Sequence, residues 1–367
     1  MEIVYHVLYL SLIAVGLSIL IIITEKYLND YGICTLDIND GEKVIQTKGG
    51  NMLLGALASE NIYIPSACGG KATCGLCKLS ITEGAGPILP TEEPYLSKDE
   101  IEKKVRLSCQ VKVKNDLKLK IPKEIFSIKQ FSAKVTKIED LTYDIKEVFL
   151  KFSESMKIDF KAGQYMQLHS KPYDKIKEGV IRAYSISSPP YVKDGVEHMI
   201  RLVPGGICTT FVHQHLKQGD EVTLSGPYGD FYLRGEGCDE LIFIAGGSGL
   251  APIKSLVLDI IEKKIDKKMV FYFGAVSKKD LFYVKFFEDI AKKHTNFRYV
   301  PALSKPEETD NWKGETGLIT DVLDRHVKDS FKSEAYLCGS PGMINACITV
   351  LNKKGFTDDK IFFDKFS

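Results

Sequence analysis

The chain opens with an apolar stretch that has no charged side chain between residues 3 and 24. A helix of this length spans about 30 Å, the thickness of the hydrocarbon core of a bilayer. A cleaved signal peptide is the alternative, but it needs a basic start and a small-residue cleavage site, which the sequence lacks. We therefore expect residues 1–26 to form a single transmembrane anchor. Because the stretch has no Asp, Glu, Lys or Arg, this anchor would not conduct ions by itself.

Residues 33–122 show the short alternating runs of a small sheet. Alternation on either side of Asp40-Gly41 predicts a hairpin. The expected elements are strands at 35–39 and 43–47, a helix at 52–59, and strands at 78–82, 105–113 and 116–121. This order is typical of a β-grasp ferredoxin domain.

Residues 129–233 are rich in strand-forming runs separated by turns, which predicts a small antiparallel barrel. A short apolar helix is expected at residues 211–216. Residues 238–367 change to alternating strands and helices, which predicts a parallel, Rossmann-like sheet. The expected fold class is therefore multidomain, α+β followed by α/β.

Composition narrows the functional classes. The 367 residues carry a net charge of +1, so no polyanion such as nucleic acid is indicated as a partner. Nine cysteines are present, and the five outside the group described next are scattered, which favours a reducing compartment over a disulfide framework. His213 and His215 are two residues apart on a predicted helix and point to different faces, so we do not expect them to bind a metal.

Cys68, Cys74 and Cys77 have C-x5-C-x2-C spacing, and Cys109 follows later. This is close to the plant-type [2Fe–2S] pattern, with one extra residue in the first gap. Glycines in the loop would let backbone N–H groups turn inward toward the cluster. A zinc site is the alternative, although structural zinc sites commonly use two short C-x2-C pairs and only one is present.

Two groups of residues in the predicted barrel have the chemistry for binding a flavin. In Arg182-Ala183-Tyr184-Ser185, an arginine suits a pyrophosphate, a tyrosine suits the isoalloxazine ring, and a hydroxyl suits the N5 edge. An ordinary strand with an exposed arginine is the alternative. Gly206, Thr209 and Thr210 stand at a predicted helix start, where unpaired N–H groups bind anions.

The glycine-rich turn Gly246-Gly247-Ser248-Gly249 lies between a predicted buried strand and a predicted helix, as in dinucleotide-binding turns. Cys338 ends another predicted strand, so it either lines a nicotinamide pocket or is a small buried apolar residue. Phe366 either frays or covers the flavin ring. Asp280 follows the predicted strand at residues 269–273 and would suit the ribose hydroxyls of NADH. Lys278 and Lys279, in the same stretch, would instead suit the 2′-phosphate of NADPH.

These motifs occur in one order, together with Ile88-Leu89-Pro90-Thr91-Glu92 and Leu107-Ser108-Cys109-Gln110. In this the chain resembles the F subunits of sodium-translocating NADH:quinone reductases, and its last two thirds resemble the ferredoxin–NADP reductase superfamily. The resemblance implies that the four cysteines ligate a [2Fe–2S] cluster and that Ser185 and Cys338 are catalytic. The FAD and NADH residues that it implies are Arg182, Tyr184, Ser185, Gly206, Thr209, Thr210, Gly246, Gly247, Gly249, Asp280 and Phe366.

The resemblance further implies an enzyme that passes electrons from NADH through FAD and the cluster to a membrane acceptor. Its partners would be other subunits of a redox complex, with quinone as the indirect acceptor. It would be a single-pass protein of the inner membrane facing the cytoplasm. One alternative is an NAD(P)H-dependent reductase that serves an oxygenase, and another is a non-catalytic electron carrier or redox sensor.

Overall fold

The computed structural model describes residues 2–28, 30–66, 68–235, 237–328 and 332–366, without the side chains of residues 2–4, 22, 23, 25–28, 124 and 127. The chain divides into two compact units, Met1–Ser127 and Ile128–Ser367.

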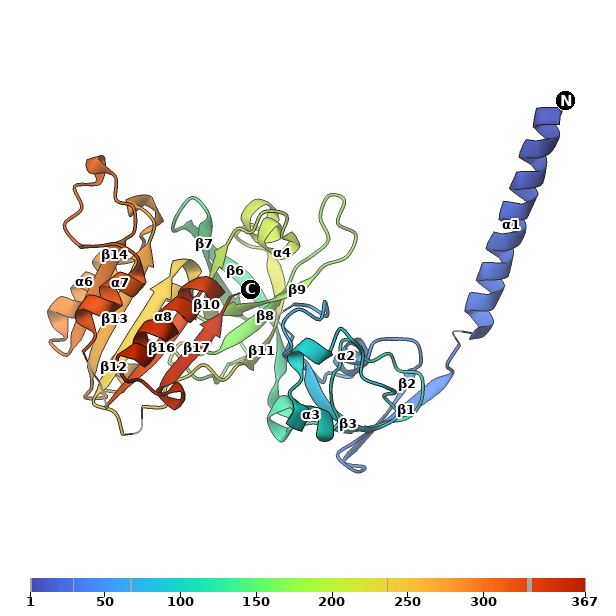
Figure 1. Cartoon of the computed structure of the whole chain (residues 1–367), viewed down its shortest axis with the longest axis horizontal. Helices are drawn as coiled ribbons and strands as arrows, with labels where there is room; N and C mark the ends of the chain where they lie inside the picture. Colours follow the sequence, from blue (N-terminus) through green and yellow to red (C-terminus); the bar gives the residue numbers. More distant parts are fainter. Residues whose placement is uncertain (1, 29, 67, 236, 329–331, 367) are drawn as a thin grey trace. The chain divides into compact units, whose positions relative to one another are not determined.

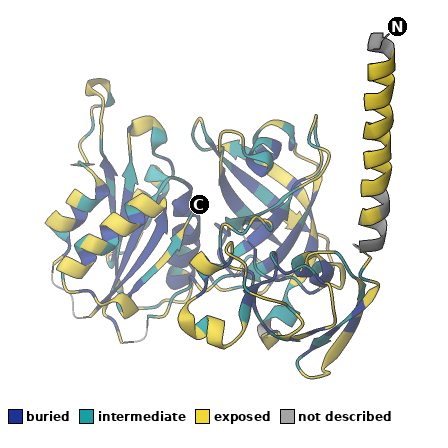
Figure 2. Ribbon diagram, turned by 45° about the vertical axis from the view of Figure 1, so that its right-hand side comes forward, coloured by how far each residue is buried: buried dark blue, intermediate teal, exposed yellow. Residues whose placement is uncertain are grey.

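Helix α1 (Glu2–Leu28) forms where the apolar stretch predicts a helix (Figure 1). Its side chains are exposed from Tyr5 to Ile21 (Figure 2). The predicted anchor, residues 1–26, falls partly outside the described residues. When the described residues alone are considered, no helix has both the length and the apolar character needed to cross a bilayer.

The rest of the first unit is built on a five-stranded sheet with the strand order β2-β1-β5-β3-β4. Strands β1 and β5 run parallel, and the other neighbours are antiparallel. Asn39, Asp40 and Gly41 have positive φ values and turn β1 into β2, as the sequence predicts. The elements after α1 are β1 (Ile33–Ile38), β2 (Lys43–Lys48), α2 (Leu53–Ser59), β3 (Lys78–Glu83), η1 (Glu93–Tyr95), α3 (Lys98–Glu102), β4 (Val105–Leu107), β5 (Leu117–Lys120) and η2 (Lys123–Ser127).

One expected strand is much shorter than predicted. The alternation over residues 105–113 predicts a single long strand, but β4 ends at Leu107. The N–H of Gln110 donates to the Leu107 carbonyl at 2.8 Å and closes a turn instead. This turn carries Cys109.

The second unit begins with a six-stranded antiparallel sheet in the order β10-β7-β6-β11-β8-β9. A bridge between Ile186 and His198 joins the chain after β9 to β10, so the barrel is nearly closed. Its elements are β6 (Lys129–Asp140), β7 (Ile145–Phe152), β8 (Tyr165–His169), β9 (Ile181–Ser185), β10 (Gly195–Arg201), α4 (Ile207–Thr210), the π-helix η3 (Phe211–His215) and β11 (Glu221–Tyr228).

The remainder of the second unit is a parallel sheet in the order β15-β14-β13-β12-β16-β17. Its elements are β12 (Glu240–Gly246), η4 (Gly247–Gly249), α5 (Leu250–Glu262), β13 (Lys268–Ala275), η5 (Lys278–Asp280), α6 (Val284–Lys293), β14 (Phe297–Leu303), η6 (Glu308–Asp310), β15 (Glu315–Thr316), α7 (Ile319–His326), β16 (Ser333–Gly339), α8 (Pro341–Lys353), η7 (Asp358–Lys360) and β17 (Ile361–Lys365).

Strand β12 shows why this sheet is buried on both faces. Phe243 packs into a core shared with α5 and α6, whereas Ile242 and Ile244 pack into a second core shared with α7 and α8. A strand covered on both sides needs a continuous apolar run, which Leu241 to Ala245 supplies. Figure 2 shows the buried strands between helices whose outer faces are exposed.

Candidate functional site

The loop that carries the first three cysteines has a strongly curled backbone. Gly69, Gly70 and Gly75 have φ values of 62°, 88° and 66°, and Ala72 also lies in this left-handed region at 55°. A Cβ atom at Gly75 would lie 2.7 Å from the Tyr95 ring. The glycines therefore serve both the curl of the loop and its close packing.

The four cysteines gather as two pairs. The Cys74 thiol donates to the Cys68 sulfur at 3.4 Å, and Cys77 shares a hydrogen bond with Cys109. Cys68, Cys77 and Cys109 are buried, and Cys74 is half-buried. A two-iron cluster takes two cysteines on each iron, so this arrangement fits it. Among the described residues, no three potential ligands converge as they would around a single metal ion.

Each pair of cysteines already favours one thiolate. The hydrogen bond from Cys74, helped by nearby backbone N–H groups, lowers the pKa of Cys68 to about 3. The bond with Cys77, and then the Gln110 side chain, lowers the pKa of Cys109 to about 7. The same bonds raise the pKa values of their partner thiols. Thiolate is the form that binds iron.

Ser108 adds a polar group next to the cysteines. Its hydroxyl is fully buried and has no oxygen or nitrogen partner within the described part of the chain. It favours the ionised form of Cys77. A buried hydroxyl without an ordinary partner is costly, and a cluster ligated by Cys77 would give it a charged acceptor.

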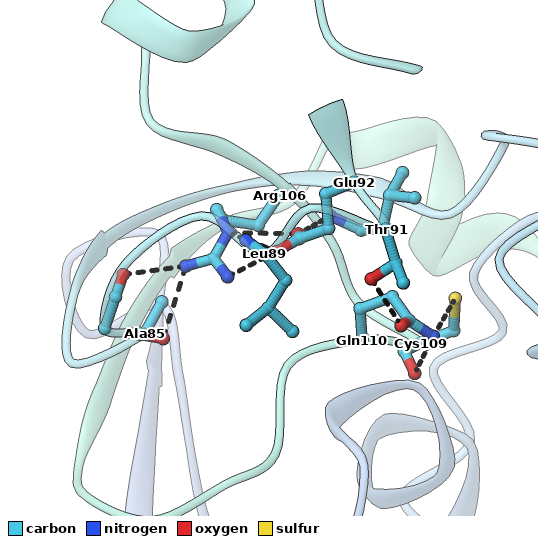
Figure 3. Close-up of polar contacts among 9 residues, drawn as sticks. Ala85, Leu89, Thr91, Glu92, Arg106, Cys109 and Gln110 are labelled. Carbon is cyan, nitrogen blue, oxygen red and sulfur yellow. Dashed lines mark hydrogen bonds and ion pairs between the residues drawn. The ribbon is translucent and has the colours of Figure 1, made fainter. Parts of the chain in front are cut away.

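Beside the cluster loop, Glu92 and Arg106 form a buried ion pair (Figure 3). The Arg106 Nε atom donates to both Glu92 oxygens at 3.0 and 3.1 Å. The N–H groups of Leu89 and Leu107 also donate to Glu92. Burial disfavours the charged carboxylate, but these donors keep the pKa of Glu92 below its ordinary value. The pair thus fixes the turn around Glu92 against the strand that leads to Cys109.

In the second unit, Arg182, Tyr184 and Ser185 lie on β9. Arg182 is half-buried, and its Nη1 atom donates to the Ile181 carbonyl. The Tyr184 hydroxyl lacks an oxygen or nitrogen partner within the described ranges, and the Cys208 thiol lies near it. Burial raises the pKa of Tyr184. A buried hydroxyl whose neighbouring partner is a weakly hydrogen-bonding thiol is compatible with a ligand at this position.

The predicted anion-binding residues lie at the start of α4. Gly206 precedes the helix, and a Cβ atom there would lie 2.6 Å from the Thr209 hydroxyl oxygen. The Thr209 hydroxyl accepts from the Val203 N–H at 3.2 Å. Thr210 is half-buried in the same turn. Glycine is therefore needed for the close packing of this turn.

The glycine turn between β12 and α5 packs directly onto the end of β16. Gly247 has a φ of 56°. A Cβ atom at Gly249 would lie 2.3 Å from the Cys338 carbonyl oxygen, and one at Gly246 would lie 2.8 Å from the Met343 sulfur. The turn brings the start of α5 next to Cys338, at the carboxyl ends of the parallel strands, where such sheets bind nucleotides.

Strand β17 brings a carboxylate to these residues. Asp364 pairs in register with Cys338, and its side chain accepts a hydrogen bond from Ser185. Burial raises the pKa of Asp364 to about 6. Burial and the nearby Asp364 also raise the pKa of the Cys338 thiol. The N–H of Phe366 donates to the Gly339 carbonyl at 2.9 Å, so the aromatic residue is held beside this group.

Asp280 has local partners. Its Oδ2 atom accepts from the N–H and the hydroxyl of Ser277, and its side chain bonds to the Tyr143 hydroxyl. The bonds between Ser277 and Asp280 were not predicted from the sequence, although the Ser-x-x-Asp spacing is a capping-box signal. Arg201 was also missed. It pairs with Asp144 at 2.7 Å and approaches the position of a Gly247 Cβ atom within 3.4 Å.

A buried lysine joins the barrel to the parallel sheet within the second unit. The Lys254 ammonium, on α5, lies 3.0 Å from Glu147 and 2.8 Å from Glu197 of the barrel. The Tyr283 hydroxyl donates to Glu147 at 2.6 Å. Although burial opposes the charged lysine, the two carboxylates raise the pKa of Lys254. The ion pairs of Lys254 therefore hold the barrel, with the candidate flavin residues, against the parallel-sheet module, with the candidate nucleotide residues.

Comparison with known families finds one matching domain in the first unit and two in the second, one for the barrel and one for the parallel sheet. Residues 36–114 match the 2Fe-2S iron-sulfur cluster binding domain. Residues 132–232 match the oxidoreductase FAD-binding domain, and residues 243–348 match the oxidoreductase NAD-binding domain. The protein is therefore an NADH oxidoreductase that uses a [2Fe–2S] cluster and FAD.

Two curated relatives align over their whole lengths. The F subunit of the Na(+)-translocating NADH-quinone reductase of Histophilus somni is 36% identical, and the alignment covers 100% of each chain. The protein of the same name from Neisseria gonorrhoeae is 34% identical, with the same coverage. This chain belongs to the family of these F subunits. The resemblance expected from the motifs is confirmed.

Solved structures show the same three modules in oxygenase systems. The Amycolatopsis cytochrome P450 reductase GcoB is 26% identical, with a TM-score of 0.72, and the match covers 91% of this chain and 98% of that one. The ferredoxin reductase in carbazole 1,9a-dioxygenase is also 26% identical, with a TM-score of 0.70 and the same coverage. Members of the family thus share their architecture with reductases of other systems.

Proposed function

We propose that this chain is the NADH-oxidising subunit of a membrane redox complex whose final acceptor is a quinone and whose electron flow is coupled to sodium movement. Two full-length relatives bear the name of a sodium-translocating NADH-quinone reductase. The observation that carries the proposal is the alignment with these relatives over 100% of each chain, which includes all three cofactor modules. Other subunits of the complex would supply the quinone site and the ion path.

The four cysteines are the proposed cluster ligands, with Cys68 and Cys74 on one iron and Cys77 and Cys109 on the other. When bound, the flavin takes two electrons from NADH as a hydride and the cluster carries electrons singly. In the second unit, Arg182 would pair with the flavin phosphates and Tyr184 would pack against the ring. The proposed residues of the anion site and of the nucleotide turn are Gly206, Thr209, Thr210, Gly246, Gly247 and Gly249.

Ser185, Cys338 and Asp364 form the proposed group around the reacting atoms. The Ser185 hydroxyl donates to Asp364, so this pair can hold a proton next to the flavin edge. The buried Cys338 thiol remains protonated and supplies an apolar wall for the nicotinamide. Phe366, held by its bond to Gly339, would cover the ring until the nicotinamide enters. We assign Asp280 to the ribose hydroxyls, which favours NADH over NADPH.

Helix α1 is the proposed membrane anchor, and the rest of the chain would face the cytoplasm from the inner membrane. The absence of charge over residues 3–24 and the exposure of its apolar side chains support this role. An anchor confines the chain to the surface where its acceptor lies and so raises the effective concentration of that acceptor.

The test is to purify the full-length chain in detergent and record its visible spectrum before and after anaerobic addition of NADH or NADPH. We expect flavin and cluster absorbance that bleaches promptly with NADH and much more slowly with NADPH. A cluster spectrum without flavin, or no bleaching with either nucleotide, would overturn the proposal.

A reductase of an oxygenase is the second candidate, favoured by the likeness to the two solved oxygenase-system reductases. The two functions differ in their acceptor. A chain that stays with the membrane fraction and feeds electrons to membrane quinone supports the first. A chain that stays soluble without detergent and reduces only a soluble partner supports the second.

A further inference from the structure

Gln110 directly follows a proposed cluster ligand and contacts its sulfur. Its Nε2 atom donates to the Cys109 sulfur at 3.7 Å and to the Cys109 carbonyl at 3.2 Å (Figure 3). The carbonyl is solely an acceptor, so it fixes which end of the amide faces Cys109. The amide N–H therefore points at the sulfur.

Thr91 holds the other end of the same amide. Its hydroxyl donates to the Gln110 Oε1 atom at 2.9 Å. Gln110 is thus bound at both ends, between a hydroxyl and a ligand sulfur.

The position of Thr91 is set by its neighbour. Glu92 accepts from the Leu89 N–H at 3.0 Å and pairs with buried Arg106, which fixes the turn that carries Thr91. Arg106 also donates to the carbonyls of Ala85 and Gly86, which precede this turn in the chain. The buried ion pair, the turn, Thr91 and Gln110 therefore form one connected path that ends at the sulfur.

We propose that Gln110, oriented by Thr91, raises the reduction potential of the cluster by donating a hydrogen bond to the Cys109 sulfur. A cluster gains negative charge on reduction, so a donor to its sulfur stabilises the reduced form more than the oxidised form. Gln110 is a positioning residue in this role, because it acts through the ligand. The inference rests on the proposal that Cys109 ligates the cluster.

The test is a redox titration of the full-length chain in detergent, with the reduced cluster followed by its electron paramagnetic resonance signal. For Gln110→Leu we expect about a tenfold lower ratio of reduced to oxidised cluster at a given potential, which is a shift of about −59 mV for one electron. Gln110→Glu replaces the donor with a carboxylate and should lower the potential at least as far.

Thr91→Val removes the hydroxyl that orients the amide, at an exposed position. We expect a smaller shift in the same direction, and no additional shift when it is combined with Gln110→Leu, because both changes break one path. Two matched controls lie in the same unit. Gln46 is an exposed glutamine on β2, and the Thr82 hydroxyl donates to the Lys118 carbonyl. Gln46→Leu and Thr82→Val should leave the potential unchanged.

An intact cluster with an unchanged potential in Gln110→Leu would overturn the inference and leave the proposed function standing. If Gln110→Leu loses its cluster, Thr91→Val decides, because an unchanged potential there also overturns it. A wild-type chain without any cluster signal, or a Cys109→Ser variant that keeps the wild-type signal, would instead overturn the proposed ligation.

Discussion

Two buried ion pairs, one in each unit, hold different kinds of structure together. Arg106 and Glu92 are close in the sequence, and their remaining bonds go to backbone groups of one turn and one strand. Lys254 reaches Glu147 and Glu197, which belong to a different sheet. The first pair fixes the local shape beside the cluster loop, and the second fixes one module against another.

The same chemistry therefore protects two different properties of the molecule. The local pair should matter for keeping the cluster. The pair between modules should matter for electron transfer from NADH to the flavin, because the proposed flavin residues belong to the barrel and the proposed nucleotide residues belong to the parallel-sheet module. Variants of each pair can separate these effects.

Arg106→Met should have the largest effect. It leaves Glu92 buried at 0% exposure without its cation, which costs about 5 kcal/mol of unfolding free energy. Denaturant titration and the cluster absorbance of the full-length chain measure the loss. The double variant Arg106→Met with Glu92→Gln should recover much of it, since no unpaired charge remains. If Arg106→Met were as stable as the wild type, the Arg106–Glu92 pair would not be what fixes the turn beside the cluster loop.

Lys254→Met should cost about 3 kcal/mol, at the lower end for a broken buried pair. Hydroxyls of Ser187 and Tyr283 still bond to Glu147 and offset part of the loss. We expect slower reduction of the flavin by NADH in stopped-flow measurements, with the cluster spectrum unchanged. Loss of the cluster with a normal flavin rate would reverse the roles assigned to the two pairs.

His198 should make the second unit sensitive to acid. Burial lowers its pKa to about 4, while its Nδ1–H donates to the Ser185 carbonyl. An unfolded histidine has a pKa of about 6.5, so the unfolded chain takes up the proton first as pH falls. Stability is full above about pH 6.5 and declines toward pH 4, by about 2 kcal/mol at pH 5.

Thermal unfolding of the second unit between pH 8 and pH 5 measures this loss, and His198→Gln should reduce its pH dependence. Asp364 acts in the opposite direction, because its raised pKa makes it stabilising at low pH and less so as pH rises through about 6. An Asp364→Asn background should therefore show the His198 effect more clearly. A flat profile there would refute it.

Lys118→Met should have the smallest effect. Lys118 pairs with Glu83 at 2.9 Å, but both side chains are at least half exposed. Exposed pairs contribute little because water screens them, so the unfolding free energy and the cluster absorbance should hardly change. The same lysine-to-methionine replacement at Lys254 and Lys118 thus compares burial directly. Equal losses of unfolding free energy in Lys254→Met and Lys118→Met would show that burial does not make the Lys254 pair more important.

Spacing and periodicity in the sequence predicted what depends on neighbouring residues. The cysteine loop, the glycine turn after β12 and the helix that follows it all lie where the patterns place them. Asn39-Asp40-Gly41 likewise turns the first hairpin as expected. In each case the local chemistry, chiefly glycine and apolar alternation, decides the conformation.

Contacts between distant residues could not be predicted in this way. Strand β17 exists because Ile361 and its neighbours pair with β16, and this pairing brings Asp364 to Ser185. Lys254 finds Glu147 across 107 positions of sequence. Alternation over residues 105–113 suggested one strand, whereas the turn at Gln110 ends it after three residues. Long-range contacts decide the first two places and a local turn decides the third, and the alternation of apolar residues encodes neither.

The curled backbone of the cysteine loop limits which substitutions the protein can accept. Gly69, Gly70 and Gly75 have φ values that L side chains rarely adopt. Any other residue at these positions would strain the loop, although none of the three glycines offers a side chain to a ligand. The loop is therefore closed to change by its backbone geometry as well as by its cysteines.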